Sequence, residues 1–302
     1  MISTLIREGN WYKGNFHTHT TVSDGELTPE QTARLYRDAG YDFLALTDHN
    51  RWGNAPLSDE KFLLFQGVEI DTVWQGGVHH IVGIGGDHPD KTLVPVEYRR
   101  DVHPQKTIDY ILGDGGIAIY AHPFWSYADH ALLASLKGLC GMEIINYSCE
   151  QEWKSGIAEE YFEYLWRDGN QIWCFGSDDA HGHVPDYRGG YIRVKAKSLT
   201  HRDILAAINE GSFTASYGPD GHTAPELYDF YVDDGVAHVE CSPCRNIYLN
   251  VRREWPGYHP AHGTPSRPLV SHSWELPKDA KTVKAILTGF DGSITWSQPI
   301  RL

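Results

Sequence analysis

Two histidines and a carboxylate stand close together near the start of the chain, in the stretch Asn15-Phe16-His17-Thr18-His19-Thr20-Thr21-Val22-Ser23-Asp24-Gly25. Side chains alternate along a β-strand, so a strand through this stretch would point His17 and His19 toward the same side. Two imidazoles that converge on one point are suited to bind a metal ion. The pair alone fits a polar strand end equally well, and the rest of the chain has to decide between the two interpretations.

The size and composition are those of a globular protein. The 302 residues have room for one large domain, or for one domain and a smaller companion. Hydrophobic residues make up 41% and charged residues 22% of the chain, which is ordinary for a globular fold. We find no apolar run of about 18 residues that would form a transmembrane helix. The first residues lack the pattern of a signal peptide, so we expect a cytoplasmic protein without a membrane partner.

The charge balance indicates which kinds of partner the protein can bind. With 26 basic and 40 acidic residues, the formal net charge is -14. We therefore do not expect the protein to bind a long nucleic acid. Bound divalent metals would reverse the local electrostatic field at a site, so the acidic composition does not exclude a small anionic substrate. Histidine is abundant, with 17 copies, and this invites a search for metal ligands. The lone pair Cys241-Ser242-Pro243-Cys244 has no second pair, and we expect it to be structural.

Short apolar runs alternate with helical patterns up to about residue 216. The strand candidates are Gly14–His19, Phe43–Thr47, Phe62–Val68, His80–Gly85, Ile117–Ala121, Met142–Asn146, Ile172–Gly176 and Tyr191–Val194. The helix candidates are a segment from Thr28 to Ala39, Pro104–Leu112, Ala131–Lys137, Lys154–Arg167 and Thr200–Glu210. This alternation predicts a parallel α/β architecture, most simply a barrel. A doubly wound sheet is the alternative, although no glycine-rich phosphate loop follows the first strand.

The sequence pattern changes after Gly218. Short strand patterns separated by turn residues, without a clear helix, predict a small antiparallel β-sandwich. We therefore expect a barrel domain over residues 1–222 and an accessory domain over residues 223–302. The segment Trp255–Gly263 is rich in aromatic residues, proline and glycine, and is interpreted as a binding loop or a long connection.

Polar residues that could bind metal follow the predicted strands almost everywhere. They are His17, His19, Asp48, His49, Glu69, His79, His80, His122, Asp178, Asp179 and His181. In a β/α barrel the carboxyl ends of the strands open onto one face, so these side chains would meet there. Many imidazoles with a few carboxylates and no thiolate favour Zn, Mn or Fe. Nine or so ligands exceed what one ion takes, which predicts two or three divalent metals and a bridging carboxylate.

Taken in order, these residues resemble the motif series of the PHP (polymerase and histidinol phosphatase) family. The matching segments are His17-x-His19 with Ser23-Asp24-Gly25, Ala45-Leu46-Thr47-Asp48-His49, Gly67-Val68-Glu69, His80-Ile81-Val82-Gly83, Ala121-His122-Pro123 and Asp179-Ala180-His181. They cover roughly Phe16 to Pro219, and as a set they are specific. The resemblance implies a distorted seven-stranded β/α barrel, TIM-like in plan, with a two- or three-metal phosphoesterase site.

The resemblance also implies a ligand set. It places His17, His19, Glu69 and Asp179 on one metal, the shared Glu69 with His80 and His122 on a second, and Asp24, His49 and His181 on a third. Glu69, Asp179 and His181 would be the catalytic residues. The choices of His80 over His79 and of Asp179 over Asp178 rest on spacing within the motifs. We interpret Asp48 as a residue that orients the loop or a histidine, and Glu143 as one that orients the ligands, with contact to substrate as its alternative role. Arg99, Arg100 and Arg188 are candidates for binding substrate phosphate.

The expected activity is hydrolysis of a phosphate ester, a monoester or a small diester, by a hydroxide bridging two metals. One alternative is a metal hydrolase of the amidohydrolase type, which usually adds a lysine that we do not find at a strand end. Another is an exonuclease acting on nucleotides or oligonucleotide ends. A degenerate barrel serving as a scaffold would lack ligands, and a candidate exists for each. We expect the insertion Asp87–His103, the segment Ser148–Ser155 and loops of the β-domain to set substrate selectivity. The oligomeric state stays open.

Overall fold

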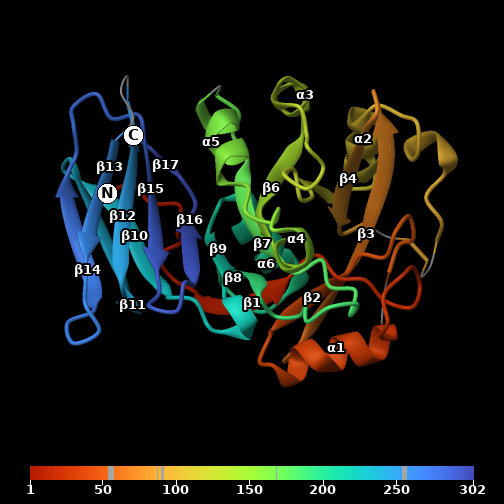
Figure 1. Ribbon diagram of the computed structural model, residues 1–302, viewed down its shortest axis with the longest axis horizontal. Helices are drawn as coiled ribbons and strands as arrows, with labels where there is room; N and C mark the ends of the chain where they lie inside the picture. The colour runs from red at the N-terminus through yellow and green to blue at the C-terminus, as the bar shows by residue number, and fades with distance from the viewer. Residues whose placement is uncertain (54–57, 87, 90–91, 168, 254–256) are drawn as a thin grey trace.

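The computed structural model covers residues 1–302, and its described residues are all of these except 54–57, 87, 90–91, 168 and 254–256. The strands of the first part are β1(Asn10–Asn15), β2(Phe43–Leu46), β3(Leu63–Trp74), β4(Gly77–Ile84), β5(Ile117–Tyr120), β6(Leu139–Asn146), β7(Trp173–Ser177), β8(Gly190–Ala196) and β9(Phe213–Tyr217). Its helices are α1(Pro29–Asp38), α2(Pro104–Gly113), α3(His130–Ser135), α4(Tyr147–Trp153), α5(Glu159–Arg167) and α6(His201–Asn209), with short 3-10 turns η1(Val96–Tyr98) and η2(Pro219–Gly221). Figure 1 shows the strands side by side with helices on the outside.

The strands β1 to β7 are neighbours in chain order, and the pairs β1–β2, β2–β3, β5–β6 and β6–β7 are parallel. β4 runs antiparallel to both β3 and β5, so the predicted uninterrupted parallel pattern is wrong at this strand. The reason is the short connection between β3 and β4. Only Gln75 and Gly76 separate β3 from β4, and both have positive φ, 50° and 83°, as in a tight hairpin turn. A parallel crossover needs a dozen or more residues.

The sheet comes together at one end, at the carboxyl ends of β1 and β7. β1 pairs with β2 on one edge and with β8 on the other, so no edge of β1 is left for β7. Beyond β1 the chain leaves β8, and Thr18 forms a parallel bridge with Ala180, just after β7. The observed fold is thus a mixed sheet with helices, followed by a second β-rich part, which confirms the coarser prediction of the architecture; the predicted TIM-like barrel is not confirmed.

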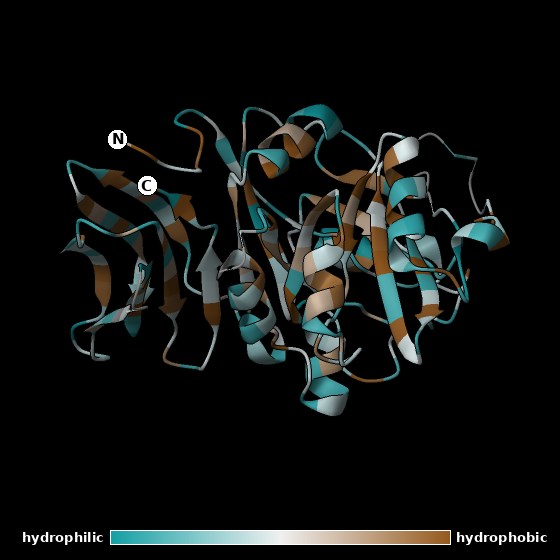
Figure 2. Ribbon diagram, turned by 90° about the horizontal axis from the view of Figure 1, so that it is seen from above, coloured by the Kyte–Doolittle hydropathy of each residue, from teal (hydrophilic) through white to brown (hydrophobic). Residues whose placement is uncertain are grey.

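Local sequence signals explain the element boundaries. Thr28 caps α1 and forms the predicted capping box with Gln31, while Pro29 occupies the first turn. α4 and β9 lie where no element was expected, and the predicted helix Lys154–Arg167 begins only at Glu159. Lys154 adopts a left-handed backbone conformation that ends α4, so α4 and α5 are two separate helices. Apolar residues fill the space between the sheet and its helices. In Figure 2 many strand segments are brown, whereas the helices carry both brown hydrophobic and teal hydrophilic residues.

The second part has two antiparallel layers. Its strands are β10(Leu227–Asp233), β11(Val236–Cys244), β12(Asn246–Arg252), β13(Gly257–His262), β14(Leu269–Glu275), β15(Thr282–Thr288), β16(Ile294–Ser297) and β17(Ile300–Arg301). The β10–β11–β14 sheet faces the sheet that contains β12 and β15, with an apolar core between them, as expected for a sandwich. Cys241 and Cys244 lie free in this core, their sulfur atoms 3.8 Å apart.

Part of the segment predicted as a loop, Trp255–Gly263, is a strand. β13 pairs with β12 along its length and lies at the end of the sheet. Pro260 is tolerated there because an edge strand has one side that forms no ladder. Residues 255 and 256 lie outside the described residues.

The two parts share one continuous sheet, because β16 pairs with β9. The N-terminus also reaches the sandwich: Ile2 pairs with Val232, and Leu5 lies in the sandwich core. The division at residue 222 therefore stays a prediction about folding units. No helix in the described part of the chain is long and apolar enough to cross a membrane.

One buried ion-pair group fastens α5 to the sandwich. The Glu163 carboxylate lies 2.7 Å from the Lys284 ammonium and 2.7 Å from the Arg252 guanidinium. Lys284 is only 4% exposed, and Glu163 is its ion-pair partner across the junction. The charges of Lys284 and Arg252 outweigh the effect of burial and lower the pKa of Glu163.

Replacing Glu163 by glutamine should therefore destabilise the protein by about 3–5 kcal/mol, because it leaves Lys284 charged and buried without its counter-charge. Glu160→Gln, on the exposed side of the same helix, should change the free energy of unfolding by less than about 0.5 kcal/mol. Urea denaturation of both variants measures the difference, and equal midpoints would contradict this account of the junction.

Candidate metal centre

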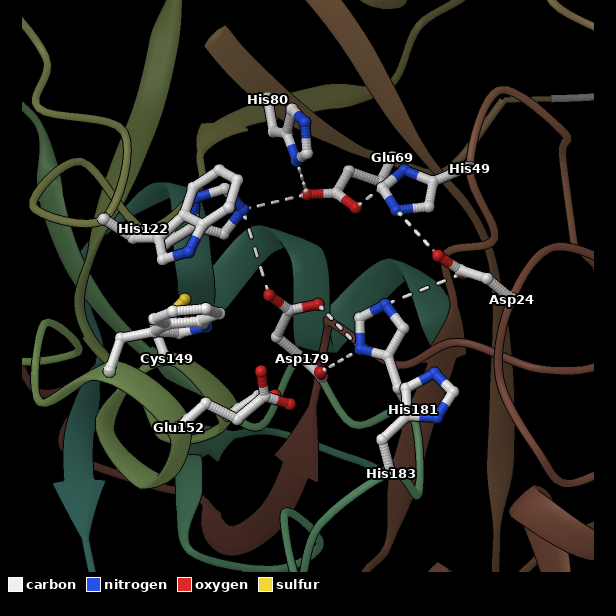
Figure 3. A pocket seen from close by; sticks show the side chains of 13 residues that line it. Asp24, His49, Glu69, His80, His122, Cys149, Glu152, Asp179, His181 and His183 are labelled. Carbon is white, nitrogen blue, oxygen red and sulfur yellow. Dashed lines mark hydrogen bonds and ion pairs between the residues drawn. The ribbon is translucent and has the colours of Figure 1, made fainter.

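The predicted ligands lie at the end of the sheet where β1 and β7 meet. His17 and His19 follow β1, because the predicted strand Gly14–His19 ends early at Asn15. The backbone N–H of Asp179 donates to the carbonyl of His17 (2.9 Å), and the N–H of His19 donates to that of Ala180 (2.9 Å). This reciprocal bridge places the side chains after β1 against those after β7. Figure 3 shows Asp179 near the middle of the resulting ring of side chains.

One group consists of His17, His19, Glu69 and Asp179, all buried. The Nε2 atom of His19 lies 3.1 Å from Glu69 Oε2 and 3.0 Å from Asp179 Oδ1, and Nε2 of His17 lies 3.2 Å and 3.1 Å from the same two carboxylates. Ligands bonded at about 2.1 Å to a tetrahedral ion stand about 3.4 Å apart. The four side chains therefore already have nearly the mutual spacing of a coordination shell.

Several buried polar atoms at this place make no well-aligned hydrogen bond, although ring nitrogens or carboxylate oxygens lie 3.0–3.2 Å away. They are Oε2 of Glu69, Oδ1 of Asp179 and Nδ1 of His49. A buried acceptor without a partner costs free energy, and a buried carboxylate costs more. A divalent cation would supply what these atoms lack, and imidazole with carboxylate is a fitting donor set for it. The residues present thus fit a metal group on their own geometry.

A second group lies nearer the mouth and consists of Asp24, His49, His181 and also His19. Oxygen atoms of Asp24 lie 3.6 Å from a ring nitrogen of each of the three histidines. The Asp24 side chain is 52% exposed, so this group is more open to solvent than the first. The sequence placed Asp24, His49 and His181 together, and the structure adds Nδ1 of His19.

Glu69 connects the groups. Its Oε1 atom lies 2.9 Å from Nδ1 of His80 and 3.2 Å from Nε2 of His122, and its Oε2 atom lies 3.2 Å from Nδ1 of His49. His49, Glu69 and His80 also form a possible metal group by themselves. One carboxylate that faces histidines from both oxygens has the geometry of a bridging ligand.

The pKa values reflect this crowding. Burial lowers the pKa of His19, but the carboxylates of Asp179 and Glu69 beside its Nε2 atom outweigh this effect and raise the value to about 10. Burial also opposes ionisation of Glu69, yet the charges of His17 and His80 hold its pKa well below the ordinary value. His49 differs, because burial dominates and lowers its pKa to about 4. Without metal, protons on the inner histidines therefore balance the carboxylates.

Glu143 orients the ligands from behind, as predicted. Its carboxylate accepts hydrogen bonds from Nδ1 of His17 (2.7 Å), from the backbone N–H of His122 (2.8 Å) and from the Asn146 amide (2.8 Å). Asn146 also donates to Asp179 (3.1 Å). With Nδ1 engaged in this way, His17 presents Nε2 to the cluster, which is the usual arrangement around a metal-binding histidine.

Asp48 holds the loop that carries Asp24. It accepts hydrogen bonds from the backbone N–H groups of Thr20 (2.8 Å) and Ser23 (3.1 Å) and from both hydroxyls. Gly25 completes the loop, because a Cβ atom there would lie 2.7 Å from the carbonyl oxygen of His19. The Ser23-Asp24-Gly25 motif is thus a packed turn rather than a free loop.

The structure distinguishes Asp178 from Asp179 and His79 from His80, the two pairs of neighbours between which motif spacing had to choose. Asp178 points away from the cluster and accepts hydrogen bonds from Tyr36, from Asn15 and from backbone N–H groups of residues 188 to 190. His79 bonds to the Tyr120 hydroxyl instead of Glu69. Asp179 has a left-handed backbone (φ 54°), as does His122 (φ 28°). Such conformations in non-glycine residues are strained and gather at functional sites, where they aim a side chain.

The cavity around the cluster has a volume of about 270 Å³. Its lining includes Trp125, Ser148, Cys149, Glu152, Trp153 and His183, which sequence reasoning did not name as site residues. Four of these belong to α4, within the segment Ser148–Ser155 that was expected to set selectivity. Of the described residues of the insertion 87–103, none lines the cavity; residues 87, 90 and 91 lie outside the described part.

The three arginines proposed for substrate phosphate do not line this cavity. The Arg99 side chain donates to the carbonyl of Val94 (2.8 Å), and the backbone N–H of Arg100 donates to Asp71 (3.0 Å). The backbone N–H of Arg188 donates to Asp178 (2.7 Å). Among the described lining residues there is no lysine or arginine.

Local sequence similarity connects the chain with phosphate-ester hydrolases. It is 39% identical over 84 residues to the 5'-3' exoribonuclease Rnm of Salmonella typhimurium, which is 25% of this chain and 29% of that protein. It is 32% identical over 84 residues to the 3',5'-nucleoside bisphosphate phosphatase of Chromobacterium violaceum, 26% of this chain and 30% of that protein. The chain thus spans about three tenths of the length of these curated relatives. No protein-family profile matches it.

Structural similarity extends over both parts of the chain. A two-domain protein from Bacteroides vulgatus, described as containing a predicted PHP-like metal-dependent phosphoesterase, superimposes with a TM-score of 0.56 and 15% identity. The match covers 98% of this chain and 96% of the other. The chain therefore shares the two-domain fold of this PHP-like protein, which agrees with the resemblance to the PHP family that its motifs indicated.

Proposed function

We propose that this protein hydrolyses phosphate esters with the help of divalent metal ions held by the cluster around Glu69. The observation that carries the proposal is the convergence on one cavity of buried donor atoms that make no well-aligned hydrogen bond, namely Glu69 Oε2, Asp179 Oδ1 and His49 Nδ1. The relatives with local sequence similarity are named as a phosphatase and as exoribonucleases, and both kinds of enzyme cleave phosphate esters.

The distances support the ligand roles that the resemblance implies. His17, His19, Glu69 and Asp179 would hold an inner metal, Glu69 with His80 and His122 a second, and Asp24, His49 and His181 a third. Zn, Mn and Fe suit these donors. Bound metals would activate water for attack on phosphorus and neutralise the phosphoryl oxygens.

The residues of the chain have their own tasks in this reaction. Glu143 and Asn146 keep His17 and Asp179 oriented, and Asp48 holds the Asp24 loop in place. His181, with a side chain 17% exposed, lies between the inner cluster and the mouth, where a substrate enters. The aromatic residues Trp125 and Trp153 give the cavity an apolar wall.

The absence of lysine from the described lining disfavours the amidohydrolase alternative, whose sites usually include one. The same absence of cations means that substrate phosphate would be neutralised chiefly by the metals. A phosphate ester with little other negative charge therefore suits this cavity best, and we propose a small phosphorylated substrate of the nucleotide type.

Removal of nucleotides from an RNA end is the second candidate. It is favoured by the similarity to exoribonuclease Rnm and by the exposure of Trp153, which is 66% exposed at the cavity and could stack on a base. The net charge of -14 disfavours extended backbone contacts, so only the end of a strand would bind tightly.

Hydrolysis should require metal. Protein of measured metal content should cleave phosphomonoesters or small phosphodiesters, lose activity with a chelator, and regain it with Mn²⁺, Zn²⁺ or Fe²⁺. His19→Ala should lower kcat/KM by at least about 100-fold because it removes a nitrogen that faces both carboxylates. His272→Ala, an exposed histidine on β14, is the matched control. A metal-loaded protein inactive on a broad panel of phosphate esters would overturn the proposal.

Metal content should fall selectively in ligand variants. His17→Ala should empty the inner position, whereas Asp24→Ala should weaken only the outer one, because Asp24 is near His19, His49 and His181 but belongs to no inner group. Elemental analysis after dialysis distinguishes the two patterns. Unchanged metal content in both variants would remove the basis of the ligand assignment.

Metal binding should release protons at pH 7. The raised pKa values of His17 and His19 mean that both rings carry a proton in the metal-free protein at this pH, and a ring nitrogen must lose it to coordinate. The apparent affinity should therefore fall as the pH is lowered. Calorimetric titration with Mn²⁺ in two buffers of different ionisation enthalpy measures the release; identical heats in both buffers would contradict it.

A further inference from the structure

A second cavity, of about 490 Å³, lies directly beside the metal cavity. The tip of the β3–β4 hairpin and the loop after His122 form its walls, and its lining includes Trp74, Gln75, Val78, Trp125, Ser126 and Tyr127. Trp125 lines both cavities, so the two are adjacent and share this one side chain.

The walls of this cavity include exposed aromatic and aliphatic side chains. Tyr127 is 82% exposed and Val78 is 38% exposed. Tyr127 also has a left-handed backbone (φ 47°), which its N–H stabilises by donating to the carbonyl of Phe124 (3.0 Å). A large side chain held out toward solvent by a strained backbone loses apolar burial, and such clusters commonly mark binding surfaces.

The loop that builds the cavity also carries a candidate metal ligand. The Ser126 hydroxyl lies 3.3 Å from Nδ1 of His122, and the Ser126 N–H donates to the His122 carbonyl (3.1 Å). The Trp125 ring centroid lies 4.9 Å from that of His122 and 5.8 Å from that of His80. A group bound against Trp125 is thus one side chain away from the metal cluster.

The lining chemistry favours an uncharged flat ligand. It contains no lysine or arginine among the described residues, and its carboxylate, Asp129, is engaged as the cap of α3. A phosphate here would meet neither lysine nor arginine among the described lining residues. Flat aromatic rings, in contrast, stack well on tryptophan and tyrosine, and the exposed Gln75 amide can both donate to and accept from a ring edge.

We propose that this second cavity binds the base of a nucleotide substrate while the phosphate ester lies at the metal cluster. The inference rests on the proposed function and adds a base-binding site to it, built by Trp74, Trp125 and Tyr127. The metals would receive the charged end and the aromatic cavity the uncharged end of one molecule.

The test compares ligands with and without a base. Tyr127→Ala should raise KM for adenosine 5'-monophosphate by roughly fivefold or more, with kcat little changed, and leave ribose 5-phosphate hydrolysis unaffected. Tyr127 is exposed, so the variant should fold normally. Tyr228→Ala, an exposed tyrosine on β10 and 45% exposed, is the matched control and should change neither substrate. Equal effects on both substrates, or none, would overturn the base site.

Binding of adenosine itself separates this inference from the proposed function. Adenosine carries no phosphate, so its affinity, followed by tryptophan fluorescence, does not depend on hydrolysis. Saturable binding that Tyr127→Ala weakens and Tyr228→Ala does not supports the base site even if no ester is cleaved, a result that would overturn the proposed function alone. Absence of adenosine binding to the wild-type protein would overturn the base site.

Discussion

The burial of the Glu69 carboxylate is the constraint on which the site depends. This side chain is 1% exposed, yet its pKa is held well below the ordinary value, because histidines surround both of its oxygens. Removing a carboxylate from water is costly unless positive charge replaces the solvent. Here that charge comes from protons on imidazoles in the metal-free protein and would come from cations in the loaded one. The carboxylates of the cluster are therefore already arranged around positive charge before a metal ion binds.

The fold delivers the ligands to this point through backbone contacts. The bridge between Thr18 and Ala180 brings the chain after β1 against the chain after β7, and the parallel bridge of His49 with Glu69 aligns the chain after β2 with the middle of β3. The reversed strand β4 places His80 in the middle of a strand, opposite Asp71 on β3. A sheet that closes only at its carboxyl end is sufficient for this purpose, because the site needs one end of the sheet and not the whole wall.

The surroundings of the cluster explain the proposed choice of substrate. The cavity has acidic side chains, imidazoles and tryptophans but no lysine or arginine among its described lining residues. Selectivity then depends on the uncharged part of the substrate, which meets aromatic surfaces on α4 and on the loop after His122. The helix α4 exists as a separate element because Lys154 turns the chain in a left-handed conformation, and this positions Glu152 and Trp153 at the mouth.

The sequence by itself determined the order and type of most elements and the set of candidate ligands, because period-two and helical patterns and strand-end polar residues are local signals. The His17-x-His19 stretch, the Asp179-Ala180-His181 motif and the capping box at Thr28 could all be read in this way. The orientation of β4, the continuity of the sheet from β9 into β16, and the division of Asp178 from Asp179 were decided only in three dimensions. The physical reason is that each depends on which partner a backbone or side chain meets: Asp178 meets the N–H groups of residues 188 to 190, whereas Asp179 meets His17 and His19. The same holds for the aromatic cavity beside Trp125, whose walls come from segments about 50 residues apart in the chain and become neighbours only through the sheet.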